Sequence, residues 1–172
     1  QGILFKEGPL TQKEFNEMKK HSLLGYRLVK NIKEISEGIR KGVLMHHEKA
    51  DGKGYPLGLT NKNIHPYAKI IAVADVYDAL TSERVYKKRF TPFDTFEEMQ
   101  TLGYTHFDPK ILITFLSNIA SYYTGAKVRM STGETGEIMA ILPQNISKPI
   151  IKIKGQIIDL SKEENCRIIE MI

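Results

Sequence analysis

The sequence has little cysteine and no long apolar run, and each scarcity excludes a class of protein. Cys166 is the only cysteine among the 172 residues, so an internal disulfide and a cysteine-rich zinc site are both excluded. A single thiol also fits a reducing compartment, and we expect a cytoplasmic protein. No stretch approaches the roughly 18 to 20 consecutive apolar residues that a membrane-spanning helix needs.

The charge of the chain favours a small anionic ligand over nucleic acid. Lys and Arg number 25 against 20 Asp and Glu, a formal balance of +5 that suits an anion such as a nucleotide. Apart from Lys87-Lys88-Arg89 the basic residues are spread out, and no basic strip is interleaved with aromatic side chains. We therefore expect no nucleic-acid partner.

The spacing of the apolar residues changes near residue 125 and predicts two parts. Residues 1–124 follow a helical period, whereas residues 125–172 contain short β-branched runs separated by glycine-containing turns. We predict a mainly α protein, with a helical domain over 1–124 and a small antiparallel β appendage over 125–172. The predicted strands cover 127–130, 137–142, 149–153 and 156–160.

Capping signals place the beginnings of the predicted helices. Thr11 and Glu14 form a capping box for the first helix, and Asp108-Pro109 provides an N-cap followed by proline at the first helical position. The other helices are predicted over about 35–48, over about 67–82 and from Thr91-Pro92. The helix over 67–82 is almost entirely apolar, so we expect it to be central and buried.

Four polar side chains fall on apolar helix faces, and they are His21, His46, His47 and Asp75. A buried carboxylate is costly unless it is paired or bound to a cation. Histidine and carboxylate from three helices that converge in a bundle core form metal sites in helical proteins, and a site without thiolates suits iron, manganese or zinc. The alternative is that each histidine is an ordinary core residue and that Asp75 pairs with a core arginine or lysine.

The directions of the adjacent residues His46 and His47 bear on how many ions they can bind. Neighbouring residues on a helix point about 100° apart, so we expect His46 and His47 to serve two ions, or one ion and one substrate oxygen. Asp75 has two oxygens and could bridge a pair of ions. Two metal ions a few ångströms apart activate a water and stabilise the leaving oxygen in phosphodiester cleavage.

Basic residues follow the predicted buried helix. Arg84 and Lys87 could hold a phosphate, arginine by bidentate hydrogen bonds and lysine as a point charge. The alternative is an exposed basic helix end that interacts with the helix dipole. His65 and His106 lie in predicted loops and are left out of the site.

These segments resemble a known family. The runs HHEKADGKGYPLGL and IIAVADVYDALTSERVYKKRF closely resemble the HD-GYP phosphodiesterases, bacterial enzymes that hydrolyse the second messenger cyclic di-GMP. The resemblance continues through GPLTQKEFNEMKKHSLLGYRLV, THFDPKILITFL and the β-rich tail, and so covers nearly the whole chain. It implies an all-helical HD bundle with two or three iron or manganese ions, which hydrolyses cyclic di-GMP to pGpG and often on to GMP.

The resemblance also implies roles for individual residues. The residues that match metal ligands are His21, His46, His47 and Asp75. The residues that match contacts to the substrate phosphates are Arg84 and Lys87. The GYP itself is Gly54, Tyr55 and Pro56, on a loop that in the family belongs to the active-site region and to contacts with GGDEF diguanylate cyclase partners.

One departure from the family pattern concerns its name-giving His-Asp pair. In the family, that pair belongs to an HDIGK-like stretch just before the segment that matches residues 3–11. The pair is absent from this sequence. Because the other matching positions are intact, we expect a fragment of an active enzyme that often carries a sensory or receiver region upstream. The alternative is a catalytically inactive cyclic di-GMP receptor or GGDEF-interaction module. Hydrolysis of another nucleotide, such as cyclic GMP-AMP, also stays open.

Overall fold

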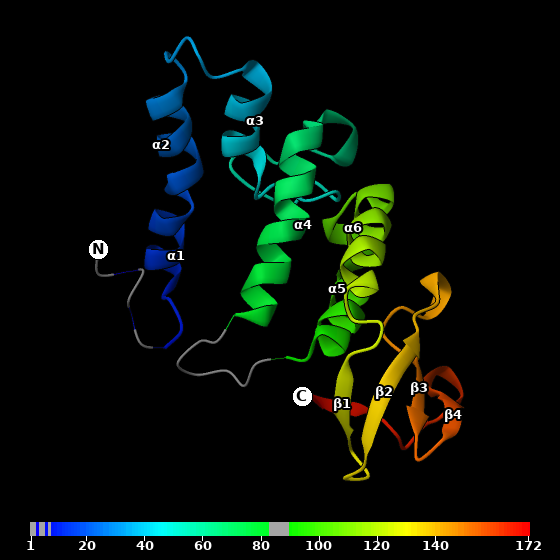
Figure 1. Cartoon of the computed structure of the whole chain (residues 1–172). Helices are drawn as coiled ribbons and strands as arrows, with labels where there is room; N and C mark the ends of the chain where they lie inside the picture. Colours follow the sequence, from blue (N-terminus) through cyan, green and yellow to red (C-terminus); the bar gives the residue numbers. More distant parts are fainter. Residues whose placement is uncertain (1–2, 4–5, 7, 83–89) are drawn as a thin grey trace. The chain divides into compact units, whose positions relative to one another are not determined.

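Both the helical and the strand-rich parts predicted from the sequence are present in the computed structural model, which describes residues 3, 6, 8–82 and 90–172 (Figure 1). Helices account for the first part and an antiparallel sheet for the second. The described residues divide into two compact units. One contains 8–76 and 102–111, and the other contains 77–82, 90–101 and 112–172.

The first unit begins with two short helices, α1 (Gln12–Met18) and α2 (Lys20–Val29). The predicted capping box is confirmed, because the Glu14 amide donates to Thr11 Oγ1 at 3.3 Å and the Thr11 amide donates to the Glu14 carboxylate at 2.7 Å. The expected single helix through His21 is wrong in detail, since a turn at Lys19 separates α1 from α2. That break sets where α2, which carries His21, begins.

Small residues bring the next two helices of this unit together. α2 and α3 (Glu37–Met45) form an antiparallel pair (Figure 1), and a Cβ on Gly25 would lie 3.1 Å from Val43 Cγ1. A Cβ on Gly42 would lie 3.1 Å from Cδ1 of Ile71, which is on α4 (Pro66–Thr81). Both distances are tighter than ordinary van der Waals contacts, so glycine sets the closeness of α2, α3 and α4.

The prediction that the apolar helix over 67–82 is buried is wrong for much of α4. Ala68 and Val73 are buried, but Tyr67, Ile70 and Ile71 are 41–51% exposed. The helix is apolar on almost every side, and such a pattern does not indicate which sides meet other protein atoms.

The second unit contains the end of α4, most of α5 (Pro92–His106) and most of α6 (Pro109–Ser121). The predicted starts of α5 and α6 are confirmed. The Thr91 amide donates to Asp94 Oδ2 at 3.0 Å, and Asp108 Oδ1 accepts the Ile111 amide at 3.3 Å. An aromatic cluster forms part of the core of this unit, and its rings are Tyr77, Phe93, Phe96, Phe115 and Tyr123.

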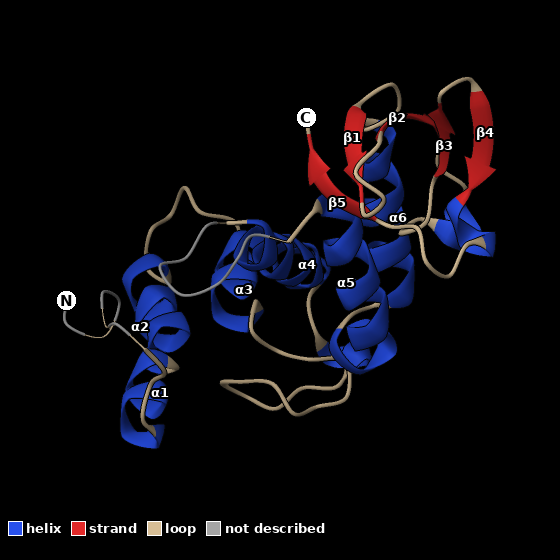
Figure 2. Ribbon diagram, turned by 90° about the horizontal axis from the view of Figure 1, so that it is seen from below, coloured by secondary structure: helices blue, strands red, loops and turns tan. Residues whose placement is uncertain are grey.

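The five strands form one antiparallel sheet in the order β4-β3-β2-β1-β5 (Figure 2). Inward side chains such as Val128, Ile138 and Ile151 are buried and alternate with exposed neighbours, as the period of two in a strand requires. The four predicted strands are confirmed with shifted ends, and β5 makes the sheet larger than predicted. The strands are β1 (Lys127–Met130), β2 (Thr135–Ala140), β3 (Ile150–Ile153), β4 (Gln156–Asp159) and β5 (Ile168–Met171).

Three short 3-10 helices complete the secondary structure of the described residues, and they are η1 (Asn61–Asn63), η2 (Pro143–Asn145) and η3 (Leu160–Lys162). No helix in the described ranges is long and apolar enough to cross a membrane. The change from helix to strand falls between Ser121 and Lys127, close to the expected position. The domain boundary at 124/125 stays a prediction, because the second compact unit takes residues from both sides of it.

The capping box gives a stability prediction. Thr11→Ala removes the side-chain acceptor for the Glu14 amide and should lower the free energy of unfolding by about 1 kcal/mol. Urea denaturation followed by circular dichroism measures this change. Thr124→Ala, at an exposed threonine beyond α6, is the matched control and should leave the midpoint unchanged. Equal midpoints for both variants would contradict a stabilising cap.

Candidate metal centre

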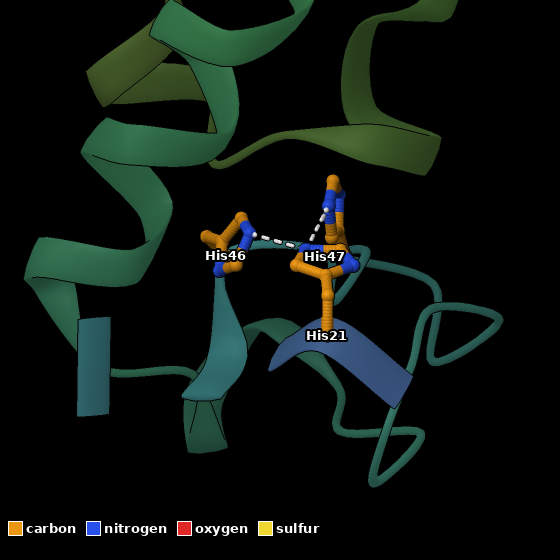
Figure 3. A group of neighbouring side chains, drawn as sticks. All are labelled: His21, His46 and His47. Atoms are coloured by element: carbon orange, nitrogen blue, oxygen red, sulfur yellow. Dashed lines mark hydrogen bonds between the residues drawn. The ribbon is translucent and has the colours of Figure 1, made fainter. Parts of the chain in front are cut away.

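Three histidine side chains converge in the first unit (Figure 3). His21 lies on α2, His46 is the C-cap of α3, and His47 is the next residue. The Nε2 atom of His21 is 3.1 Å from Nε2 of His46 and 3.1 Å from Nε2 of His47. One potential ligand atom from each ring lies within 4.8 Å of the others. Two adjacent helices therefore bring three imidazole nitrogens to one place.

The end of α3 explains how two adjacent histidines reach the same point. The predicted helix through residue 48 is wrong, because α3 ends at Met45 and His47 already lies in the following turn. His46, the C-cap, itself keeps right-handed helical backbone angles (φ −64°, ψ −13°), and His47 lies beyond the cap. The rings of His46 and His47 lie with their centroids 4.2 Å apart, so both can face a single ion.

Backbone carbonyls determine which nitrogen of two rings carries the proton. Nδ1 of His21 donates to the Met18 carbonyl at 2.8 Å, and Nδ1 of His46 donates to the Val43 carbonyl at 2.8 Å. A neutral imidazole has one N–H, so in both rings the Nε2 lone pair is left facing the centre. A hydrogen bond from the other ring nitrogen to a backbone carbonyl is a common way to orient metal-binding histidines.

Those lone pairs form a site that fits a cation. Two nitrogens that are both acceptors repel each other at 3.1 Å unless a proton or a metal ion lies between them. Imidazole nitrogens bound to one ion at about 2.0–2.1 Å would stand roughly 3 Å apart. None of the three rings is fully buried, which does not favour the alternative of ordinary core histidines. The residues present therefore fit a divalent metal ion.

The third ring is held neutral by its surroundings. Burial, followed by the neighbouring His46 and His21, lowers the pKa of His47 to about 4. At neutral pH its imidazole is therefore unprotonated, which is the form that binds metal. Its Nδ1 lies 3.8 Å from Asp75 Oδ2, longer than a hydrogen bond.

Asp75 lies beside the three histidines rather than among them. Its side chain is 51% exposed, so the expectation of a buried carboxylate is wrong. The expectation came from the apolar residues around Asp75 in the sequence, but on α4 several of these are themselves exposed. A carboxylate in this position can reach solvent and His47 without the cost of burial.

The GYP segment covers one side of His47. The Tyr55 ring lies 4.7 Å from the His47 ring at an interplanar angle of 31°, and the Tyr55 amide donates to the His47 carbonyl at 3.1 Å. Burial, with a contribution from Asp75, raises the pKa of Tyr55 to about 12, so its hydroxyl stays protonated at neutral pH. Lys19 Nζ lies 5.8 Å from the centroid of the same ring and adds positive charge at the edge of the site.

Glu48 is the site residue that sequence reasoning missed. Glu48 belongs to the motif HHEKADGKGYP, but the sequence pattern did not predict a function for it. Its carboxylate is almost fully buried and accepts the backbone amides of Leu57 at 2.6 Å and Leu59 at 2.8 Å. The available signal was an acidic residue between a histidine pair and a turn rich in glycine and proline, a place where a carboxylate can bind free loop amides.

Gly54 packs against the backbone that carries these groups. A Cβ at Gly54 would collide with the backbone nitrogen of Lys49 and with Cα of Glu48. Backbone atoms cannot rotate away as a flexible side chain can, so only glycine fits here. The first residue of the GYP is therefore required for the loop to lie against the end of α3.

The remaining sequence-based candidates lie elsewhere. His65 contacts the Tyr67 ring and His106 contacts Phe107. His65 lies in a loop as predicted, whereas His106 is the last residue of α5, and neither belongs to the cluster. Arg84 and Lys87, the predicted phosphate contacts, lie outside the described residues.

The amino-acid sequence of this chain is similar to those of known proteins. A family model for the HD domain matches residues 3–111. A cyclic di-GMP phosphodiesterase of Pseudomonas aeruginosa is 35% identical over 151 residues, which cover 88% of this chain and 36% of that protein. A 3'3'-cGAMP-specific phosphodiesterase of Vibrio cholerae is 36% identical over 117 residues, which cover 67% of this chain and 22% of that protein. The chain thus spans about a third or less of the length of these relatives.

A solved structure supports the fold. An HDG"Y"P protein from Bdellovibrio bacteriovorus matches 70% of this chain and 36% of its own, with a TM-score of 0.53. The two sequences are 18% identical over the match, so this likeness concerns the fold alone.

The tight packing of Gly54 gives a prediction for metal binding. Gly54→Ala should displace the loop from the end of α3 and weaken Mn²⁺ binding by about 10-fold or more, because groups that orient metal ligands typically contribute 10–100-fold to affinity. Isothermal titration with Mn²⁺ measures the change. Gly133→Ala is the control, since its φ of +86° makes alanine strained there while no atom lies within 4 Å of the added Cβ. Equal Mn²⁺ affinities in the two variants would contradict the role of Gly54.

Proposed function

This chain belongs to the HD domain family, and from that membership we propose that it is the catalytic part of a metal-dependent phosphodiesterase that hydrolyses cyclic di-GMP. The resemblance expected from the sequence is confirmed, because the HD domain model matches residues 3–111 and a cyclic di-GMP phosphodiesterase is 35% identical over 151 residues. The single observation that carries the proposal is the convergence of three imidazoles, in which His21 and His46 direct their Nε2 lone pairs toward each other. The parent protein would release pGpG and then GMP.

We propose that His21, His46 and His47 hold a divalent ion and that Asp75 contributes an oxygen to the same ion or to a second one. Iron or manganese suits imidazole and carboxylate ligands without thiolate, and two or three ions are expected from the family resemblance. When bound, the metal supplies Lewis-acid chemistry and lowers the pKa of a coordinated water.

The residues of the chain prepare the site for that chemistry. The carbonyls of Met18 and Val43 orient His21 and His46 with their lone pairs inward. Tyr55 covers one side of His47 and limits the access of water there. The exposed carboxylate of Asp75 lies beside His47, where one of its oxygens could join the proposed ligand set.

We propose that Arg84 and Lys87 contact the substrate phosphates, on the strength of the sequence resemblance. Two relatives named for cyclic di-GMP and for 3'3'-cGAMP hydrolysis support a cyclic dinucleotide as the substrate class. Cyclic GMP-AMP is therefore the second candidate substrate. We also propose that the GYP loop contacts a GGDEF partner, since Leu57 directly follows the GYP and is 54% exposed.

The metal proposal predicts a loss of both binding and turnover. His47→Ala in the full-length parent protein should reduce Mn²⁺ binding and cyclic di-GMP hydrolysis at least 100-fold, because it removes a proposed ligand. His65→Ala, at a histidine outside the cluster, should leave both unchanged. Metal content by atomic emission and product formation by chromatography measure the two effects. Wild-type values in His47→Ala would rule out the proposed ligand set.

The phosphate contact predicts a different pattern. Arg84→Ala should raise KM or lower kcat/KM for cyclic di-GMP by roughly 10- to 100-fold, as expected for a lost hydrogen bond to a charged group, while metal content stays unchanged. Arg129→Ala, at an exposed arginine of the sheet, is the control. Parallel assays with cyclic GMP-AMP identify the preferred substrate. A loss of metal in Arg84→Ala would argue against a role limited to the substrate.

A further inference from the structure

We propose that Glu48 is a positioning residue for the metal centre. Its buried carboxylate fastens the loop 54–59 to the end of α3 and thereby holds the Tyr55 ring against His47. This inference rests on the proposed function, because it assumes that the three histidines bind metal. It concerns a residue that supplies no atom to the cluster.

The carboxylate is bound by the loop itself. Glu48 is 3% exposed, and its two oxygens accept the amides of Leu57 at 2.6 Å and Leu59 at 2.8 Å. A buried carboxylate is tolerated only when it is hydrogen-bonded or paired, and among the described residues no lysine, arginine or histidine forms an ion pair with it. The two loop amides therefore provide the compensation, and such charge-assisted bonds are among the stronger ones.

The loop joins this anchor to His47. Leu57 and Leu59 are held by the Glu48 side chain, while Gly54 packs on the Glu48 and Lys49 backbone and the Tyr55 amide donates to the His47 carbonyl. The segment is thus held at both of its ends. Between these anchors the Tyr55 ring is kept 4.7 Å from the ring of His47.

Of the three histidines, His47 needs this support most. His21 and His46 are each oriented by an Nδ1–H that donates to a backbone carbonyl of the preceding turn. Among the described residues no hydrogen bond holds Nδ1 of His47, and its neighbour Asp75, at 3.8 Å, is half exposed. The ring of His47 also contacts those of His21 and His46. Packing against Tyr55 further restricts its rotation, and Glu48 acts on the cluster through Tyr55.

A role as a direct ligand does not fit the geometry of Glu48. Both oxygens are occupied by N–H donors, and the close group of potential ligand atoms among the described residues contains the three histidines and not Glu48. Its contribution is therefore to orientation, in the manner of the outer-shell groups that commonly support metal-binding histidines.

Glu48→Gln tests the inference with almost no change in shape. The amide can accept only one of the two N–H donors, and its own NH₂ group faces the other. We expect faster hydrogen exchange at the Leu57 and Leu59 amides, weaker NMR cross-peaks between the Tyr55 and His47 rings, and 10- to 100-fold weaker Mn²⁺ binding by isothermal titration. The last value follows the usual effect of removing an outer-shell group.

Asp108→Asn is the matched control. Asp108 lies in the same unit, and its carboxylate likewise accepts two backbone amides, of Lys110 and Ile111, besides pairing with Lys69 at 3.0 Å. Its substitution should lower the thermal midpoint and leave Mn²⁺ affinity unchanged. An equal loss of Mn²⁺ affinity in the Asp108 variant would mean that any destabilisation of this unit weakens Mn²⁺ binding. That result would overturn the inference.

The remaining outcomes separate this inference from the proposed function. A wild-type chain that binds no Mn²⁺ overturns the proposed function and, with it, the role of Glu48. A wild-type chain that binds Mn²⁺ and a folded Glu48→Gln variant that binds it equally well overturn only the role of Glu48.

A second variant keeps the test decisive if Glu48→Gln does not fold. Tyr55→Leu removes the ring that contacts His47 and leaves the Glu48 anchor in place. It should weaken Mn²⁺ binding by about 10-fold without faster exchange at Leu57 and Leu59. Unchanged affinity in Tyr55→Leu would overturn the inference. Where both variants fold, their effects on affinity should not add, because they act through one contact.

Discussion

The mutual repulsion of imidazole lone pairs is the constraint on which the candidate site depends. Backbone carbonyls take the Nδ1–H of His21 and of His46, which leaves two Nε2 acceptors 3.1 Å apart. Such an arrangement is unfavourable by itself and becomes favourable when a cation lies between the rings. The low pKa of His47 points the same way, because burial, followed by the neighbouring His46 and His21, disfavours its charged form. The local structure therefore serves to hold neutral ligands close together before an ion binds.

The segment that follows the histidines is built to support that arrangement. Gly54 allows the loop to touch the backbone at the end of α3, and the Glu48 carboxylate accepts the amides of Leu57 and Leu59. The GYP residues thus have a physical explanation that is independent of any partner protein. Glycine permits the approach, and tyrosine packs on a proposed ligand. The closeness of the HHE and GYP segments in the sequence reflects their contact in space.

Local signals in the sequence predicted the secondary structure well. The capping residues before α1, α5 and α6 and the approximate positions of β1 to β4 were found as expected, because caps and strand-forming runs depend on neighbours a few residues away. Two expectations failed where a longer-range choice was involved. The end of α3 at Met45 placed His47 beyond the helix, and the exposure of α4 left Asp75 partly in solvent. Neither a helix end without a strong breaker nor the buried side of an all-apolar helix can be determined from spacing.

Residue types and motifs were enough to indicate the chemistry proposed for this chain. Histidines and a carboxylate without thiolates restricted the metal, and the HHE to GYP run indicated the family. The meeting of the three rings, the position of Asp75 beside His47 and the attachment of the loop to Glu48 came from the fold. The reason is physical, because residue type sets which bonds a side chain can form, whereas the direction of each ring depends on where helices end and which backbone groups lie within hydrogen-bonding distance.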